Sequence, residues 1–164
     1  MASTLLLIMV PLLVPAQGME LPAVNQRVVD FVNSRIGTKV GHGECWDLAA
    51  EALNTAGAKW DGAYGFGDVV DWRKQEVLPG DIVQFENVFV EHRSDRMVMR
   101  EQYGLHTAVV VEVKGQGDYV LAHQNVKPVG KKVGIAPLLM SEVRSGKLRF
   151  YRPLDQGWSR SKGE

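Results

Sequence analysis

The sequence contains a single cysteine among its 164 residues, so no disulfide bond can form within the chain. It has no CxxC or HExxH pattern, and one cysteine with four histidines does not predict a structural zinc site. No apolar run approaches the ~20 residues that a transmembrane helix needs. Neither sign of charge prevails, because 19 basic residues balance 19 acidic ones. We therefore expect no metal or other cofactor, no nucleic-acid partner and no stable membrane span.

The chain begins with a short apolar stretch that is typical of a signal peptide. Residues 5–14 carry no charge, and the small residues Ala16 and Gly18 follow at positions suited to cleavage. No Lys or Arg precedes the stretch, which leaves open a second interpretation in which translation starts at Met19. We expect residues 1–18 to be the signal peptide of a secreted or periplasmic protein. A start at Met19 would instead leave the protein in the cytoplasm.

The rest of the chain is long enough for one domain with a single core. Apolar spacing predicts helices at 22–36 and 44–56, and strands at 82–90, 107–113, 119–125 and 148–153. The charged residues 91–104, which include His92, show no clear period and are interpreted as a surface excursion. Helices first and antiparallel strands afterwards predict an α+β fold over residues 19–154, with the helices on one face of the sheet. Residues 155–164 are expected to be a loose tail.

The only cysteine, Cys45, stands where a loop with Gly41 and Gly43 turns into the second predicted helix. In the first turn of a helix, unpaired backbone amides and the positive end of the helix dipole favour the thiolate form. The thiolate is the nucleophilic form, so Cys45 is a candidate catalytic residue. The alternative is a buried cysteine that packs as a small apolar side chain. His42 lies in the same loop and is expected to be exposed to solvent.

A cysteine nucleophile needs a base within hydrogen-bond reach, and the base needs a partner that orients it. His106 comes directly before a valine-rich strand, and His123 lies near the end of the next strand. A hairpin turn centred within residues 114–117 would pair positions that sum to 231, so that His106 faces Asn125 and His123 faces Ala108. All four side chains would then share one face of the sheet. The alternative is a sheet face that presents histidines to solvent.

The order of these motifs resembles that of a known superfamily. G-x-G-E-C-W-D-L-A, L-P-G-D-I-V-Q-F, H-T-A-V-V-V and H-Q-N-V follow one another over residues 40–126. This order resembles the papain-like superfamily of CHAP and NlpC-type amidases and peptidases. Within it, the chain is most similar to the cysteine-proteinase-fold domain of fungal actin-patch, myosin-interacting proteins, which also has bacterial relatives.

The resemblance implies a role for each candidate residue. Cys45 matches the nucleophile, His106 the base and His123 the third, orienting residue. Asn125 matches an asparagine that CHAP domains carry two residues after their third residue. CHAP domains usually have glutamate at the position of His123, whereas NlpC-type enzymes commonly have histidine. The mechanism therefore carries over better than the substrate, because a fold does not determine a substrate.

The implied reaction is hydrolysis of an amide bond through a thioester. The thiolate of Cys45 would attack the carbonyl carbon, and His106 would transfer the proton to the leaving amine. The backbone N–H of Cys45 is the natural first donor to the oxyanion. The expected partner is a peptide or peptidoglycan-like substrate, such as a cell-wall peptide. The alternative function is a catalytically silent protein-binding domain on the same fold.

Overall fold

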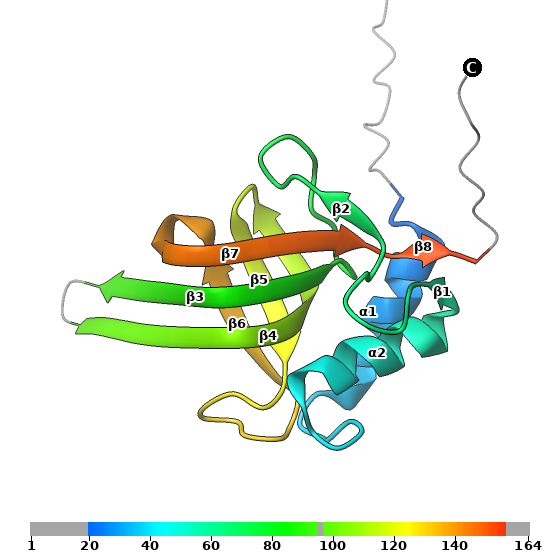
Figure 1. The fold of residues 1–164 in the computed structure, drawn as a ribbon, viewed down its shortest axis with the longest axis horizontal. Helices are drawn as coiled ribbons and strands as arrows, with labels where there is room; N and C mark the ends of the chain where they lie inside the picture. The colour runs from blue at the N-terminus through cyan, green and yellow to red at the C-terminus, as the bar shows by residue number, and fades with distance from the viewer. Residues whose placement is uncertain (1–19, 95–96, 157–164) are drawn as a thin grey trace, which may run out of the picture.

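The computed structural model describes residues 20–94 and 97–156 (Figure 1). The predicted signal peptide, residues 1–18, lies outside this part of the chain and stays a prediction, as does the tail beyond Gln156. In chain order the elements are α1 (Ala23–Arg35), α2 (Cys45–Ala56), β1 (Ala58–Lys59), β2 (Asp68–Val70), β3 (Ile82–Ser94), β4 (Met97–Gly115), β5 (Asp118–His123), β6 (Gly134–Leu139), the 3-10 helix η1 (Met140–Glu142), β7 (Val143–Arg152) and β8 (Leu154–Asp155). Within the described ranges, no helix is long and apolar enough to cross a membrane.

Both helices lie close to where their apolar periodicity predicts them. The start of α2 is fixed at Glu44, whose N–H donates to the Asp47 carboxylate and whose carbonyl oxygen accepts the N–H of Asp47. Gly57 ends the helix with a φ of 66°, a left-handed conformation that glycine adopts without a steric penalty from a Cβ atom. These local signals place Cys45 as the first residue of α2.

Six strands form one antiparallel sheet in the order β2-β7-β3-β4-β5-β6, and the short β1 pairs with β8. The helices α1 and α2 pack against each other and against β4. In Figure 1 both helices lie at one end of the sheet, beside the start of β3 and the end of β5. The predicted α+β architecture is confirmed.

The helix-covered part of the sheet is buried on both faces. Ile82 and Val109 belong to a core beneath the two helices, whereas the adjacent Val83 and Val110 belong to a second core on the opposite face. Side chains from β2, β6 and β7 complete this second core. Burial on both faces explains why residues 107–113 form a continuous apolar run instead of an alternating one.

The prediction of a surface excursion at 91–104 is wrong, because residues 91–94 and 97–104 form the outer half of a long two-stranded ribbon in which β3 pairs with β4. The alternation of apolar and polar residues that marks a strand is hidden, because the side chains of the ribbon switch from one face to the other midway. Phe85 and Val88 both enter the second core, although residues three apart lie on opposite faces of a regular strand. Their partners across the ladder are His106 and Tyr103, whose rings lie 5.2 Å apart.

Other strand boundaries also differ from the prediction. The strand predicted at 148–153 begins earlier, at Val143, and the one predicted at 119–125 ends at His123. The strand β6 has no counterpart in the prediction. It contains Pro137, which lacks the N–H that an inner strand needs, and β6 indeed lies at the edge of the sheet.

Candidate active site

Cys45 lies at the N-terminus of α2 and is partly exposed. The loop before it turns at Gly41 and Gly43, which have φ angles of 55° and 86°. At Gly43 a side chain would also collide with its surroundings, since a Cβ atom would lie 2.8 Å from the Lys131 side chain. The glycines therefore allow the close approach of this loop to the segment after β5. His42, in the same loop, is exposed as expected.

His106 and His123 form a buried pair, each about 5% exposed. Nε2 of His106 lies 3.3 Å from Nδ1 of His123, and the rings meet edge to face. Phe85 and Tyr103 pack against the His106 ring. The pair leaves Nδ1 of His106 for another partner. Two of the residues singled out in the sequence are thus brought together by direct contact.

Burial controls the charge of this pair. It lowers the pKa of His106 to about 3, with a smaller contribution from the neighbouring His123. It also lowers the pKa of His123 to about 4, partly opposed by the negative charge of Glu101. Both imidazoles are therefore neutral at pH 7. Each imidazole then has one donor and one acceptor nitrogen, so in their hydrogen bond one ring donates its proton and the other accepts it.

The strand register that joins the two histidines is the predicted one, although the route to it differs. At the turn, Gly115 pairs with Asp118, so paired positions sum to 233 there. Two register shifts lie between the turn and Val110. Beyond them, Val109 pairs with Ala122, at the predicted sum of 231. The bulges thus restore the register that a regular hairpin with its turn centred one residue earlier would have produced.

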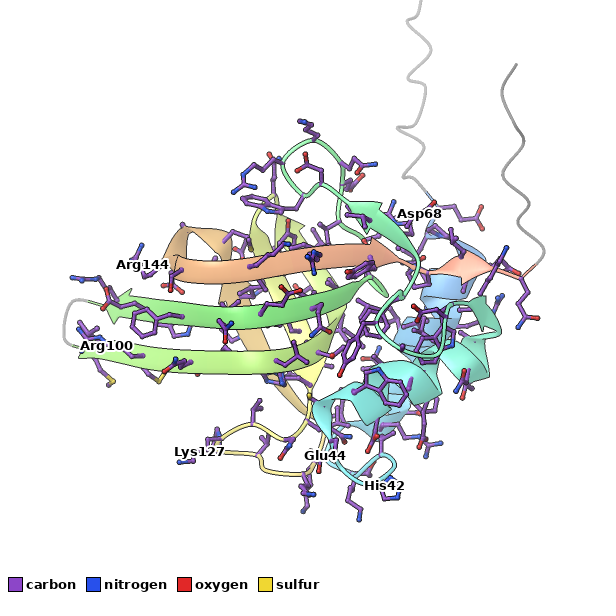
Figure 2. All side chains as sticks on the ribbon, viewed as in Figure 1. His42, Glu44, Asp68, Arg100, Lys127 and Arg144 are labelled. Atoms are coloured by element: carbon purple, nitrogen blue, oxygen red, sulfur yellow. The ribbon has the colours of Figure 1, made fainter. Side chains whose placement is uncertain are left out.

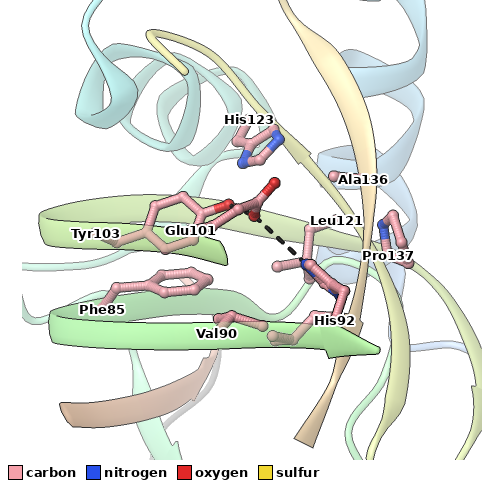
Figure 3. A pocket seen from close by; sticks show the side chains of 10 residues that line it. Phe85, Val90, His92, Glu101, Tyr103, Leu121, His123, Ala136 and Pro137 are labelled. Carbon is pink, nitrogen blue, oxygen red and sulfur yellow. Dashed lines mark hydrogen bonds and ion pairs between the residues drawn. The ribbon is translucent and has the colours of Figure 1, made fainter. Parts of the chain in front are cut away.

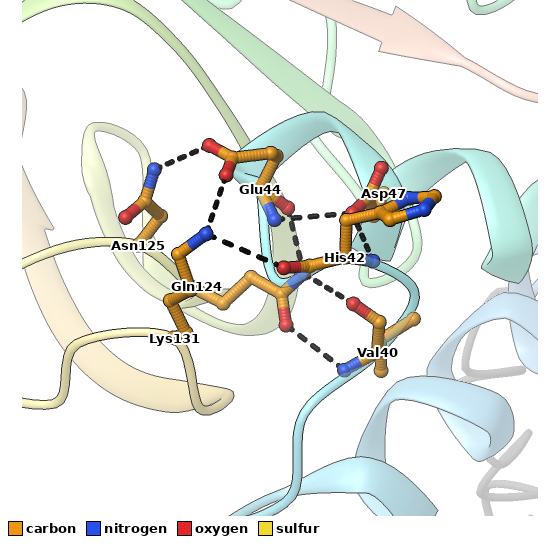
Figure 4. A network of polar contacts seen from close by, with 7 residues as sticks. All are labelled: Val40, His42, Glu44, Asp47, Gln124, Asn125 and Lys131. Atoms are coloured by element: carbon orange, nitrogen blue, oxygen red, sulfur yellow. Dashed lines mark hydrogen bonds and ion pairs between the residues drawn. The ribbon is translucent and has the colours of Figure 1, made fainter.

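Asn125 lies beyond the end of β5 and does not pair with His106. Its φ of 62° marks a left-handed turn in the chain. Its side-chain amide donates to Oε2 of Glu44 over 2.6 Å, and Lys131 pairs with the other oxygen of Glu44 over 2.8 Å (Figure 4). In this structure it is therefore His123 that contacts His106, whereas Asn125 contacts the cap of α2.

Gln124 is a structural residue of the site that the sequence did not single out. It is fully buried, and its side chain accepts the N–H of Val40 and donates to the carbonyl oxygens of Val40 and Glu44 (Figure 4). These hydrogen bonds tie the end of β5 to the start of α2. Because Gln124 follows His123 directly, one dipeptide contacts both halves of the candidate site.

A polar cluster lies next to the histidine pair. His123, Glu101, Tyr103 and His92 line a small cavity of about 10 Å³ (Figure 3). The hydroxyl of Tyr103 donates to Oε2 of Glu101 over 2.5 Å, and Nε2 of His92 lies 3.7 Å from the same oxygen. His92 also contacts Glu142 of η1, with 2.6 Å between Nδ1 and Oε2. His92 was expected at the surface, but it belongs to this partly buried cluster.

A wider groove opens beside His106. It has a volume of about 680 Å³ and is lined by residues 99–106 of β4 and by residues 125–128. Figure 2 shows Arg100 near the outer end of β4 and Lys127 in the facing loop. Among the described residues, β5 pairs with β4 only from Val109 onward, so the groove follows a free strand edge.

The thiol of Cys45 forms no hydrogen bond with any described residue. The pair of histidines and the thiol are therefore not joined into a hydrogen-bonded triad in this state. Catalytic hydrogen bonds of free enzymes are often long and shorten when substrate binds. The described part of the chain contains no group of three or more His, Cys, Asp or Glu residues that could hold a metal ion. The chemistry available to the site is that of a thiol with neutral imidazoles.

The fold resembles two solved structures of low sequence identity. The crystal structure of Ly7917 has a TM-score of 0.46 and 17% identity, and the match covers 77% of this chain and 62% of that one. NlpC2 from Trichomonas vaginalis has a TM-score of 0.47 and 17% identity, with coverage of 84% and 49%.

Sequence comparison gives a closer match. The protein "Altered inheritance of mitochondria protein 3" of Debaryomyces hansenii is 29% identical over 161 residues, which cover 85% of this chain. This chain spans only 17% of the length of that relative. The family model of the AIM3/BBC1 cysteine proteinase-fold domain matches residues 22–163, which is nearly all of the chain after the predicted signal peptide. The chain therefore belongs to the family of AIM3/BBC1 cysteine proteinase-fold domains, with a papain-like α+β fold.

Proposed function

We propose that the protein is a thiol-dependent amidohydrolase that cleaves an amide bond of an extended peptide. The observation that carries this proposal is the buried contact between His106 and His123 at the inner end of a groove, with the next residue, Gln124, hydrogen-bonded to the cap of α2. Two histidines at the surface would stay in contact with solvent, whereas these two are buried and held in direct contact. Cys45 supplies the nucleophile from the helix N-terminus.

The reaction would proceed by acyl transfer. Nδ1 of His106 accepts the thiol proton of Cys45 while the sulfur attacks the carbonyl carbon, and the C–N bond breaks as the same proton passes to the leaving amine. Water then hydrolyses the thioester, which releases the acid and restores the thiol. The backbone N–H of Cys45 would stabilise the oxyanion, a contribution of about 3 kcal/mol for a well-aimed donor. His123 would hold the His106 ring in place throughout.

An extended peptide suits the groove because of the exposed edge of β4. Half of the backbone N–H and C=O groups of an edge strand point away from the sheet and can pair with an added strand. The exposed side chains of Met99 and Leu105 offer apolar contacts along this edge. A cell-wall peptide and an unfolded protein segment both meet this description. His106 lies where such a strand would reach the covered part of the sheet.

A second candidate function is that of a protein-binding domain without catalysis. Two observations favour it: the Cys45 thiol has no hydrogen bond within the described chain, and a pKa of about 3 makes His106 a weak proton acceptor. The groove and the free edge of β4 would serve binding equally well. The relative from Debaryomyces hansenii is far longer, so such a domain would act within a larger protein.

Hydrolysis assays can decide between the two functions. Purified protein would be incubated with peptidoglycan fragments and, separately, with unfolded casein, and new amine and acid termini would be detected by mass spectrometry. We expect cleavage by the wild type, none by Cys45→Ala, and a loss of about 100-fold or more in His106→Gln. His42→Gln is the matched control, because His42 is an exposed histidine of the same region and should retain full activity. Binding of these substrates without cleavage, together with equal iodoacetamide labelling of wild type and His106→Gln, would support the binding domain instead.

A further inference from the structure

We propose that Glu101 is a positioning residue of this site, which fixes the direction of the hydrogen bond between His123 and His106. The inference rests on the proposed function only in assigning His106 as the base that faces Cys45. Glu101 comes from the ribbon segment at 91–104 and is absent from the motifs that relate the chain to its superfamily.

The need for such a residue follows from the chemistry of two neutral imidazoles. A proton on Nε2 of His106 can donate to Nδ1 of His123, or a proton on Nδ1 of His123 can donate to Nε2 of His106. Only the first arrangement leaves Nδ1 of His106 without a proton, and so able to accept one from a thiol. The second arrangement protonates Nδ1 of His106 and removes the base. The contact of 3.3 Å is compatible with both.

A carboxylate beside His123 selects the first arrangement, because an ionised carboxylate can only accept hydrogen bonds. It draws the His123 proton to Nε2, which leaves Nδ1 of His123 as an acceptor for the Nε2 proton of His106. Glu101 lines the same small cavity as His123, and Figure 3 shows its carboxylate directed toward that ring. The charge of Glu101 also acts on His123, since it raises the pKa of that imidazole against the effect of burial.

The surroundings hold Glu101 in this orientation. The Tyr103 hydroxyl and the His92 ring both contact Oε2, at 2.5 and 3.7 Å, and His92 is itself held by Glu142. Within the described residues no hydrogen bond is made to Oε1 of Glu101, so this oxygen is available to His123. These four polar side chains come from three elements: His92 from β3, Glu101 and Tyr103 from β4, and Glu142 from η1. The packing of these elements therefore sets the position of the Glu101 carboxylate.

Nuclear magnetic resonance of the imidazole nitrogens tests this inference directly. In full-length protein labelled with 15N-histidine at pH 7, we expect His106 and His123 both to carry their proton on Nε2. In Glu101→Gln, whose amide can also donate, and in Glu101→Leu, we expect a second population with the proton on Nδ1. The rate of Cys45 alkylation by iodoacetamide should fall about tenfold in the same variants, as expected when a base is lost from the resting site. Glu142→Gln is the matched control, because it alters the same cluster without facing His123.

The outcomes separate this inference from the proposed function. Altered tautomers in the Glu101 variants with unchanged tautomers in Glu142→Gln support the inference, even if no substrate is cleaved by the wild type. Unchanged tautomers in Glu101→Gln, or equal changes in Glu142→Gln, overturn it, even if the wild type is an active hydrolase. If Glu101→Leu does not fold, the Gln variant decides, and Tyr103→Phe serves as a second test. Removing that hydroxyl keeps the charge but frees the carboxylate, so the second tautomer should again become detectable.

Discussion

Replacing Gln124 with methionine should loosen the start of α2 without emptying the space that the side chain fills. The amide of Gln124 is fully buried and makes three hydrogen bonds to the backbone before and at the helix cap. Methionine has a similar length and no strong hydrogen-bonding group. The substitution therefore isolates the polar contribution of Gln124 from its packing.

The magnitude follows from which backbone groups lose their only partner. The N–H of Val40 would be buried and unpaired, which costs about 2 kcal/mol. The carbonyl oxygens of Val40 and Glu44 keep other donors, Gly43 and Asp47, so each lost bond costs only about 1 kcal/mol. Burying a thioether in place of an amide returns about 1 kcal/mol. The free energy of unfolding should thus fall by about 3 kcal/mol.

Urea unfolding followed by circular dichroism measures this change, and for a chain of this size the melting temperature should fall by roughly 6–12 °C. The matched control is Gln102→Met, since Gln102 is exposed and its substitution should change stability by less than about 0.5 kcal/mol. Equal urea midpoints for the two variants would refute the reasoning, because the burial and hydrogen bonds of Gln124 would then make no difference to stability. A change in m-value would instead indicate an altered denatured or native ensemble.

Two further predictions concern stability. Because folding lowers the pKa of His106 to about 3 and of His123 to about 4, the unfolded chain binds more protons than the folded chain below pH 6.5. Their contribution to stability is present above that pH and lost as the pH falls. The free energy of unfolding should change by up to about 2.7 kcal/mol per pH unit between roughly pH 4.5 and 6. Urea titrations at several pH values should show this slope, and a wild-type slope no steeper than that of His106→Phe would contradict it. Gly67→Ala should cost at least about 3 kcal/mol, because its Cβ atom would lie 2.0 Å from the carbonyl oxygen of Arg152. Gly62→Ala, at a positive φ of 76° and in open space, should cost only about 1 kcal/mol, and equal melting temperatures for the two variants would be inconsistent with the clash.

The elements with strong local signals could be predicted from the sequence. The helix at Cys45 is specified by the glycines before it, by its apolar period and by Gly57 after it. The hairpin after β4 is specified by its turn. The sum of 231 for paired positions near the histidines was predicted correctly, although the turn itself has a sum of 233. His106 was expected to face Asn125, and its contact with His123 was not predicted. The β-bulges that restore the register have no signature in a single sequence, since they depend on how β4 packs between β3 and β5.

The outer ribbon could not be predicted because its signal depends on tertiary contacts. A strand is read from alternation, and alternation fails where β3 and β4 change faces between Phe85 and Val88. The charged side chains of this ribbon suggested solvent, yet Glu101 and His92 lie against the opposite side of the curved sheet, near β6. Glu101 and His92 were therefore both missed for the same reason, because the sequence did not show that the outer ribbon folds against the sheet.

The dipeptide at the end of β5 explains how the two halves of the site stay in register. Successive residues of an extended chain point to opposite sides, so His123 faces the second core and the His106 ring, while Gln124 faces the loop before α2. A shift of this segment by one residue would exchange the two environments. It would bury an imidazole against the backbone of Val40 and leave His106 without its partner. The same hydrogen bonds that stabilise the start of α2 thus also select the register in which the candidate base is oriented, so stability and chemistry at this site cannot be varied independently.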